Sequence, residues 1–112
     1  FHPLLYQKEL LDFCKENNII ITSYSPLARG KVFKEPVLND IAKKYNKTAG
    51  QIALKWLLEK NTIVIPKAST ESHLKENLEI LDFKLHSEDI RKIDNIREQH
   101  RLVNPDFAEF DY

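Results

Sequence analysis

The chain lacks several features that would assign it to a class at once. Its 17 basic residues balance 17 acidic ones, so no net field favours a nucleic acid or an acidic membrane surface. No apolar run approaches the ~18 residues that a membrane helix needs, and repeats and low-complexity tracts are missing. We therefore expect a protein that binds neither nucleic acid nor a membrane.

Cysteine and methionine are equally scarce. Cys14 is the single cysteine and can form no disulfide within the chain, which fits a reducing cytosol and a cytoplasmic protein. We interpret it as a small apolar residue on a helix face rather than a reactive thiol. No secretory signal opens the chain. Because methionine is absent and Phe1 comes first, we expect the natural start to lie upstream.

What the chain does contain is a clear apolar periodicity over 112 residues, enough for one small domain with a core. Two short β-branched runs predict buried strands at 19–24 and 62–65, the first of them buried on both faces. Amphipathic spacing predicts helices over residues 7–17, 36–45, 49–60, from about 70, and 88–98.

Capping residues and apolar faces add detail to these helices. Thr48 and Gln51 match a capping box, in which each side chain satisfies the other residue's backbone N–H, and Ser87 is expected to cap the last helix. Each helix is predicted to turn one face inward: Leu10, Leu11, Phe13 and Cys14 in the first, Leu38, Ile41, Ala42 and Tyr45 in the second, Ala49, Ile52, Ala53, Trp56 and Leu57 in the third, Leu74, Leu78 and Leu81 in the fourth, and Ile90, Ile93 and Ile96 in the last.

Strands that alternate with helices predict an α/β fold, in which helices cover a parallel sheet. Yet only two strands are clear, with the end of a third at Phe1, and strands of this kind need neighbours on both edges. The helices also carry more apolar surface than two strands can cover. We therefore expect the chain to be part of a larger sheet.

Two loops follow the two strands, "YSPLARG" at 24–30 and "PKASTES" at 66–72. Because the carboxyl ends of parallel strands share one edge of a sheet, where ligands of α/β proteins gather, we expect the loops to converge. The second loop also opens a helix, whose unsatisfied N–H groups attract anions.

Groups that suit an anion gather at this second loop and along the helix that it opens. They are the cation Lys67, the hydroxyls of Ser69 and Thr70, and a helix face of Thr70, His73 and Asn77 with Glu76 at its margin. A phosphate at the helix start, with an adenosine along that face, would satisfy these groups. The alternative is a plain helix cap at Thr70 beside a solvated polar face, and the pattern alone leaves both interpretations open.

Three blocks of the sequence carry a specific resemblance. They are "HPLLYQKELLDFCKENNIIITSYSPLARG", "PVLNDIAKKYNKTAGQIALKWLLEKNTIVIPKASTESHLKENLEILDFKLHSEDI" and "RLVNPDFAEF", which cover nearly the whole chain. Within them "YSPL" is followed by "IPK" and then, after a further eight residues, by "EN". In these blocks the chain resembles the C-terminal portion of an aldo-keto reductase.

This resemblance implies a (β/α)₈ TIM barrel whose full-length form uses NADPH to reduce aldehydes and ketones to alcohols. A complete barrel has about 250 residues or more, so residues 1–112 would be the C-terminal segment of a single barrel domain: the end of strand six, strands seven and eight, and their helices. The segment would be incomplete alone. Its partners would be the remainder of the barrel, a nicotinamide dinucleotide and a small carbonyl substrate, with residues 99–112 as a tail near the substrate pocket.

The resemblance also implies cofactor contacts in the first loop. Tyr24 matches the aromatic residue that stacks on the nicotinamide ring. Ser25, Leu27 and Arg29 match the stretch that folds over the pyrophosphate, although the family often has a small or amide residue at the position of Arg29.

In the second loop, Lys67, Ser69 and Thr70 match the clamp for the adenosine ribose and its 2′-phosphate. Ala68 stands where the family often has serine, so a contact there would come from the backbone alone.

On the helix that follows, Glu76 and Asn77 match the pair that hydrogen-bonds the adenine, whereas His73 departs from the pattern. The family usually has arginine at that position, where it stacks on the adenine and reaches the 2′-phosphate. Histidine can stack but lacks the guanidinium fork, and imidazoles are mostly neutral at pH 7. We expect a weaker preference for NADPH, with some use of NADH and a selectivity that falls as the pH rises.

The family's catalytic tyrosine, lysine, aspartate and histidine lie upstream, and no residue of this chain matches them; no metal site is predicted either. His2 belongs to the "HP" motif after strand six and is interpreted as structural. Phe107 and Phe110 lie in the tail and would either contact substrate or pack the tail down.

Two other interpretations of the whole chain stay open. One is a cofactor-binding barrel without catalysis, acting as a sensor or an accessory subunit, and the other is a fragment that self-associates into a barrel-like oligomer.

Overall fold

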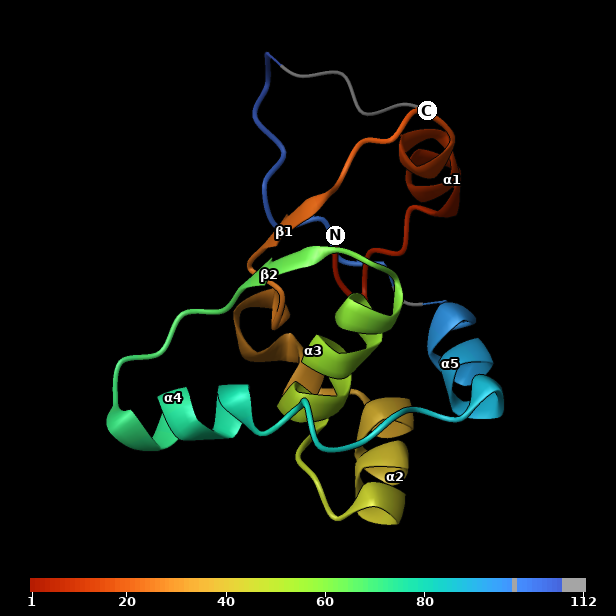
Figure 1. Ribbon diagram of the computed structural model, residues 1–112. Helices are drawn as coiled ribbons and strands as arrows, with labels where there is room; N and C mark the ends of the chain where they lie inside the picture. Colours follow the sequence, from red (N-terminus) through yellow and green to blue (C-terminus); the bar gives the residue numbers. More distant parts are fainter. Residues whose placement is uncertain (98, 108–112) are drawn as a thin grey trace.

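The computed structural model describes residues 1–97 and 99–107. Helices and strands alternate along this part of the chain, as Figure 1 shows. In order they are α1 (Lys8–Glu16), β1 (Thr22–Tyr24), the 3₁₀ helix η1 (Ala28–Lys34), α2 (Pro36–Tyr45), α3 (Ala49–Glu59), β2 (Ile63–Ile65), α4 (Glu71–Leu78) and α5 (Ser87–Asp94). The α/β alternation predicted from the apolar spacing is confirmed.

The two strands lie side by side and parallel, with Thr22 opposite Ile63 and Tyr24 opposite Ile65 (Figure 1). The register is reinforced by a buried polar link, because the hydroxyl of Ser23 donates to that of Thr62 at 3.2 Å. The parallel pairing confirms the sequence prediction. It places the loops after β1 and β2 at the same edge of the sheet.

The core forms around α3, which lies beneath the sheet in Figure 1. Every apolar position predicted to face inward on this helix is buried, and Trp56 is fully so. The Trp56 ring stacks on Phe1 with centroids 5.7 Å apart and meets the edge of Tyr6 at 5.2 Å. Its indole N–H donates to Asp94 at 2.8 Å, so α5 is tied to the same residue.

The predicted capping box at the start of α3 is confirmed. The Thr48 hydroxyl accepts from the Gln51 N–H at 3.2 Å, and the Gln51 side-chain oxygen accepts from the Thr48 N–H at 3.0 Å. The predicted cap at Ser87 is wrong, since Ser87 is the first helical residue and His86 is the N-cap. The His86 N–H donates instead to the Tyr45 hydroxyl at 2.9 Å, and His86 has an extended backbone. The helix therefore begins one residue earlier than the sequence predicted.

The stretch predicted as a plain loop after β1 contains η1. Its path bends sharply, because Arg29 and Gly30 have left-handed φ angles of 51° and 86°. The kink directs the chain from the edge of the sheet down toward α2.

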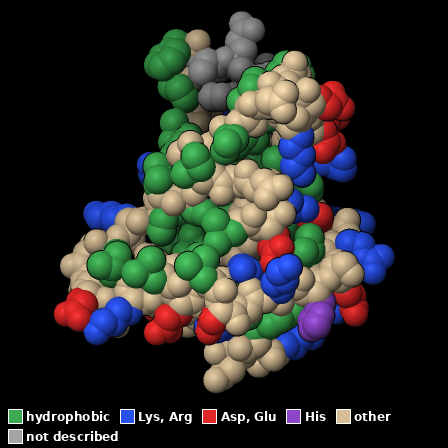
Figure 2. All heavy atoms as spheres, in the orientation of Figure 1, with side chains coloured by type: hydrophobic (Ala, Val, Ile, Leu, Met, Phe, Trp, Pro, Cys, Tyr) green, Lys and Arg blue, Asp and Glu red, His purple; other side chains and the backbone are tan. Residues whose placement is uncertain are grey.

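Several apolar faces predicted to be buried are exposed. No residue of α4 is buried, and Leu74, Leu78 and Leu81 are 53%, 62% and 74% exposed. Their prediction was wrong for a simple reason: within the described residues nothing packs over that side of α4. Figure 2 shows hydrophobic patches, in green, along the lower left part of the molecule where Figure 1 places α4 and above it near the sheet.

Apolar side chains predicted to be buried are also exposed on α1 and around β1. Leu10 and Phe13 are exposed, although Leu11 and Cys14 on the same helix are buried. The run 19–24, predicted to be buried on both faces, alternates: Thr22 and Tyr24 are exposed and Ser23 is buried. The prediction that the second strand is buried is also wrong, because Ile63 and Ile65 on β2 are exposed where nothing in the described chain packs on them. The sheet has a covered face and an uncovered one in this chain.

Among the described residues, no helix is long and apolar enough to span a membrane.

Candidate functional site

Several of the predicted site residues meet in one pocket of about 540 Å³, which we call the α4 pocket. It lies between η1, α2, the start of α3 and α4. Its wall is formed by Leu27, Phe33, Asn39, Ala42, Lys43, Lys47, Thr48, Ala49, Lys67, His73, Glu76 and Asn77. Leu27 comes from the loop after β1, and Lys67 comes from the loop after β2. The expected convergence of the two loops is therefore present at this point.

The polar face of α4 turns toward this pocket, with His73, Glu76 and Asn77 on the wall. The helix begins at Glu71, and Thr70 is its N-cap: the Thr70 hydroxyl oxygen accepts from the His73 N–H at 3.2 Å. The capping alternative for Thr70 is thus realised. It does not exclude a ligand contact, because a hydroxyl that accepts one hydrogen bond can still donate another.

The capping box of α3 also holds α4 in place. The Thr48 hydroxyl donates to the Glu76 carboxylate at 2.7 Å, and the Gln51 amide donates to the Glu76 backbone oxygen at 3.0 Å. Two residues that cap one helix therefore position a side chain on the next. The sequence predicted the capping box but not this second use of it.

The cations on the pocket wall differ in how they are held. Lys47 is paired with Asp82 at 3.0 Å and lies over the Phe83 ring at 5.2 Å. The hydrogen bond from Lys47 lowers the pKa of Asp82 below its usual value. Lys43 pairs with Asp40 at 3.4 Å. Lys67, by contrast, makes no ion pair within residues 1–97 and 99–107, so its charge is available to an anion.

Phe33 is a wall residue that the sequence analysis missed. Its side chain is 47% exposed, and two atoms of its ring lie 3.0 Å from the point that a Cβ on Gly50 would occupy. The absence of a side chain at Gly50 lets the aromatic ring rest against α3, and Phe33 forms part of the pocket wall. An isolated glycine in a helical pattern was the available signal, since such a glycine often marks close packing.

The first-loop residues other than Leu27 lie elsewhere. Tyr24 and Ser25 line a small cavity of about 20 Å³, which we call the His2 cavity. Its remaining wall residues are Phe1, His2, Leu5, Arg101, Leu102 and Val103. Tyr24 is half exposed at the carboxyl end of β1.

The remaining predicted site residues line neither the α4 pocket nor the His2 cavity. Arg29 is exposed at the kink of η1, and Ala68 and Ser69 lie in the connection between β2 and α4. Phe107 is 92% exposed, so it does not pack down the described part of the tail. Phe110 lies outside the described residues.

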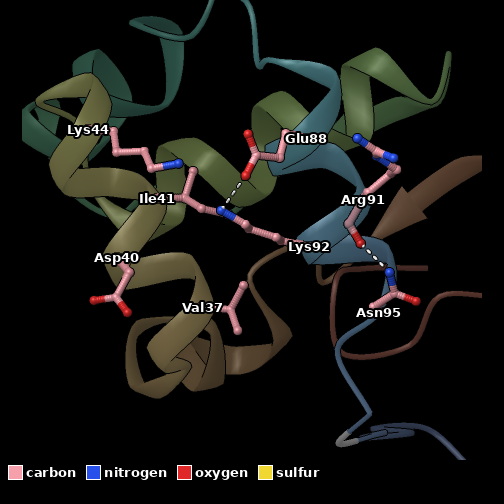
Figure 3. Close-up of a pocket in the computed structure, with 8 residues that line it drawn as sticks. All are labelled: Val37, Asp40, Ile41, Lys44, Glu88, Arg91, Lys92 and Asn95. Carbon is pink, nitrogen blue, oxygen red and sulfur yellow. Dashed lines mark hydrogen bonds and ion pairs between the residues drawn. The ribbon is translucent and has the colours of Figure 1, made fainter.

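A second pocket of about 610 Å³ lies between α2 and α5 and contains none of the predicted site residues. Figure 3 shows its charged side chains, with Lys92 paired to Glu88 at 3.0 Å. Lys44, on the same wall, bonds to the buried Asp89 at 2.7 Å. These charges form part of the network that joins the two helices.

Within the described residues, no group of three or more His, Cys, Asp or Glu side chains could hold a metal ion.

The α4 pocket thus combines a cation, a flat aromatic ring and adjacent carboxylate and amide groups. Phosphate suits Lys67, an aromatic heterocycle suits the face of Phe33, and exocyclic amines and ring nitrogens suit Glu76 and Asn77. A phosphorylated adenosine presents all three kinds of group.

Comparisons with known proteins show which family the chain resembles. A sequence model described as the Aldo/keto reductase family matches residues 1–98. The chain is 44% identical over its full length to an uncharacterized oxidoreductase, YtbE, of Bacillus subtilis (strain 168), and covers 40% of that protein. It is 43% identical to the glyoxal reductase of the same organism, over 95% of this chain and 39% of the relative.

A solved structure also resembles the chain closely. A Gox0644 mutant in complex with NADPH superimposes with a TM-score of 0.88 and 31% identity, over 98% of this chain and 41% of that protein. The chain therefore spans about 40% of the length of the relatives that it matches. On the matched residues and the shared fold, the chain belongs to the aldo/keto reductase family.

Proposed function

We propose that the full-length protein reduces aldehydes or ketones to alcohols with NADPH, and that this segment supplies much of the cofactor site. The observation that carries the proposal is the α4 pocket, where Lys67, His73, Glu76 and Asn77 meet Leu27. Within the proposal, residues 1–112 are the C-terminal segment of one barrel domain: the end of strand six, strands seven and eight, and their helices. The tail, 99–112, would lie near the substrate pocket.

The adenosine end of the cofactor is proposed to bind in the α4 pocket. Lys67 would pair with the 2′-phosphate, while the hydroxyls of Ser69 and Thr70 and the backbone at Ala68 would donate to the ribose phosphate. Glu76, which Thr48 already orients, would accept from the adenine amine.

The same end has two further contacts. Asn77 would complete the adenine pair, and Phe33 would lie against the face of the base. This assignment extends the family-based set by one residue, Phe33, which rests on Gly50 within the wall of the pocket.

The nicotinamide end is proposed to bind beside the carboxyl end of β1. Tyr24, half exposed there, would support one face of the ring, which leaves the other face for the substrate. Ser25, Leu27 and Arg29 would follow the pyrophosphate along the bend of η1. Arg29 is exposed, and within the proposal its guanidinium would turn toward the pyrophosphate.

When bound, the cofactor supplies the hydride for the carbonyl carbon. The residues of this chain bind and orient it, and the proton for the carbonyl oxygen would come from a residue upstream. The segment alone is therefore expected to bind the cofactor without catalysing reduction.

The first test replaces Lys67 in the full-length enzyme. Lys67→Ala should raise the KM for NADPH about tenfold while changing the KM for NADH little, because only NADPH carries the 2′-phosphate. Lys43→Ala is the matched control, since Lys43 lies on the same wall but is paired with Asp40. An equal effect of Lys67→Ala on both cofactors would contradict the assignment.

The second test concerns His73 and the expected use of NADH. Because an imidazole lacks the guanidinium fork that pairs with a phosphate, the ratio of kcat/KM for NADPH to that for NADH should be modest in the wild type. His73→Arg should raise this ratio about tenfold. A strong preference for NADPH that survives His73→Ala would rule out this role.

A second candidate is a cofactor-binding relative without catalysis, acting as a sensor or an accessory subunit. It is kept because none of the family's catalytic positions matches a residue of this chain. The two candidates separate in one experiment on the full-length protein: NADPH binding followed by fluorescence, and NADPH oxidation with a panel of aldehydes. Binding that Lys67→Ala weakens, with no oxidation of NADPH, would favour the second candidate.

A further inference from the structure

The His2 cavity, distinct from the α4 pocket, contains a buried polar atom that the proposed function does not use. The cavity volume of about 20 Å³ exceeds the ~10–15 Å³ that one water molecule requires. Larger ligands are excluded by this size. The question is therefore whether its wall offers a water molecule enough hydrogen bonds.

His2 supplies the first of these. Its side chain is only 2% exposed, and its Nδ1 atom is buried without a hydrogen-bond partner among the described residues. Leaving such an atom unsatisfied is costly, which is why nearly all of them have a partner. Burial is the main cause that lowers the pKa of His2 to about 4. The ring is therefore neutral at pH 7, with one nitrogen that donates and one that accepts.

Tyr24, Ser25 and Arg101 are the other wall residues with polar side chains, the first two at the sheet and the third in the tail. Ser25 has a left-handed φ of 47°, an unfavourable conformation for a residue with a Cβ, and its backbone oxygen accepts from the Ala28 N–H at 2.9 Å. The tail is tied to the same region, because the His100 N–H donates to the Leu4 backbone oxygen at 2.6 Å. The cavity is thus enclosed by three separate parts of the chain.

We propose that one water molecule occupies the His2 cavity, hydrogen-bonded to Nδ1 of His2, and that through it His2 positions Ser25 at the turn that leaves β1. The water satisfies the buried ring nitrogen and links it to the Ser25 hydroxyl. His2 is in this sense a positioning residue, which explains a polar side chain at a position that packing alone would fill with an apolar one. The effect on cofactor binding rests on the proposed function of Ser25, whereas the water molecule does not.

The direct test is a crystal structure of the full-length protein at a resolution that shows ordered solvent. We expect a water molecule about 3 Å from Nδ1 of His2 and within hydrogen-bonding distance of Ser25. Absence of solvent density in the cavity, or a side chain from elsewhere in the protein bonded to Nδ1, would overturn the proposal.

Three variants of the full-length protein give an independent test. His2→Asn keeps an amide near the position of Nδ1, His2→Gln places its amide near Nε2 instead, and His2→Leu has neither. We expect His2→Asn to retain the water and to bind NADPH within about twofold of the wild type. His2→Gln and His2→Leu should lower the urea midpoint and weaken NADPH binding about tenfold, the effect of one lost hydrogen bond.

Equal behaviour of His2→Asn and His2→Gln would contradict a role for Nδ1. Circular dichroism checks that each variant is folded. If His2→Leu does not fold, the comparison of His2→Asn with His2→Gln still tests whether Nδ1 is the atom that matters. If the wild-type protein fails to bind NADPH, the proposed function is wrong. The solvent density and the urea midpoints then still test the water molecule.

Discussion

Asp89 shows how much a single buried side chain can connect in this protein. It is 2% exposed, and both of its oxygens are occupied: Lys44 donates to one and the Tyr45 hydroxyl to the other, each at 2.7 Å. Tyr45 in turn accepts from the His86 N–H, so the chain of hydrogen bonds joins α2 to the start of α5. Burial raises the pKa of Asp89, but the hydrogen bonds from Lys44 and Tyr45 outweigh it and the pKa is lowered overall.

Removing this carboxylate should destabilise the protein. We expect Asp89→Ala to lower the free energy of unfolding by about 2 kcal/mol, because the Tyr45 hydroxyl loses its acceptor in a largely buried place. Asp40→Ala is the matched control, since its pair with Lys43 is exposed and should contribute almost nothing. Urea unfolding of the full-length protein measures both, and equal effects would contradict the role of Asp89.

The lowered pKa of Asp89 also predicts a pH dependence. A carboxylate whose pKa is lower in the folded state stabilises the fold above its ordinary pKa of 3.8, and this contribution is lost as the pH falls through the lower, folded value. The difference in unfolding free energy between the wild type and Asp89→Asn should therefore shrink below pH 3.8. A difference that stays constant down to the acid-unfolded state would argue against ionised Asp89.

Among the elements, the junction of α3 with α4 links stability to the candidate site. Thr48 caps α3 and also donates to Glu76 on α4, while no residue of α4 is itself buried. A helix without buried side chains depends on such polar contacts for its placement. The geometry of the α4 pocket is therefore set partly from the neighbouring helix.

Replacing Thr48 should affect both properties at once. Thr48→Ala removes the cap and should lower the unfolding free energy by about 1 kcal/mol. It should also raise the KM for NADPH, because Glu76 is no longer oriented. Thr48→Ser keeps the hydroxyl and should behave as the wild type in urea unfolding and in steady-state kinetics. Loss of stability without a change in KM would separate the cap from the site.

At the scale of the whole molecule, one side of the fold is uncovered. Large apolar side chains just before β1, on β2, and on or just after α4 are half exposed or more: Ile19, Ile20, Ile63, Ile65, Leu74, Leu78 and Leu81. Together they make a larger apolar area than isolated surface residues usually do. In the barrel proposed above, the upstream part of the domain would cover these side chains. The relative YtbE is about two and a half times as long as this chain.

The isolated chain 1–112 should therefore bind a hydrophobic dye and self-associate in gel filtration, whereas the full-length protein should do neither. Leu78→Lys, in the middle of the uncovered face, should reduce dye binding by the isolated chain. Lys34→Glu, a substitution at an exposed charged position, is the control. A monomeric, well-folded chain without dye binding would show that these faces need no cover. A single oligomer of defined size would favour a self-associating fragment.

Much of the local structure follows from the residues themselves. The spacing of apolar residues and the capping residues predicted the helices, the parallel strands and the reciprocal pairing of Thr48 with Gln51. These features depend on neighbours only a few positions away in the chain. The polar face of α4 was predictable for the same reason, since helical geometry alone places His73 and Asn77 on one side. Family resemblance, also a property of the sequence, supplied the assignment of the cofactor contacts.

Only the tertiary structure decided which surfaces meet. It covers Trp56 and leaves Leu78 exposed, although both lie on regular apolar stripes, because burial depends on what packs opposite. It brings Phe33 to the α4 pocket through the bend of η1 and places Ser25 beside His2. The sequence by itself determined the elements and their polar and apolar sides through short-range geometry. Which of those sides became core, pocket or open surface depended on contacts between residues far apart in the chain, and no periodicity encodes those.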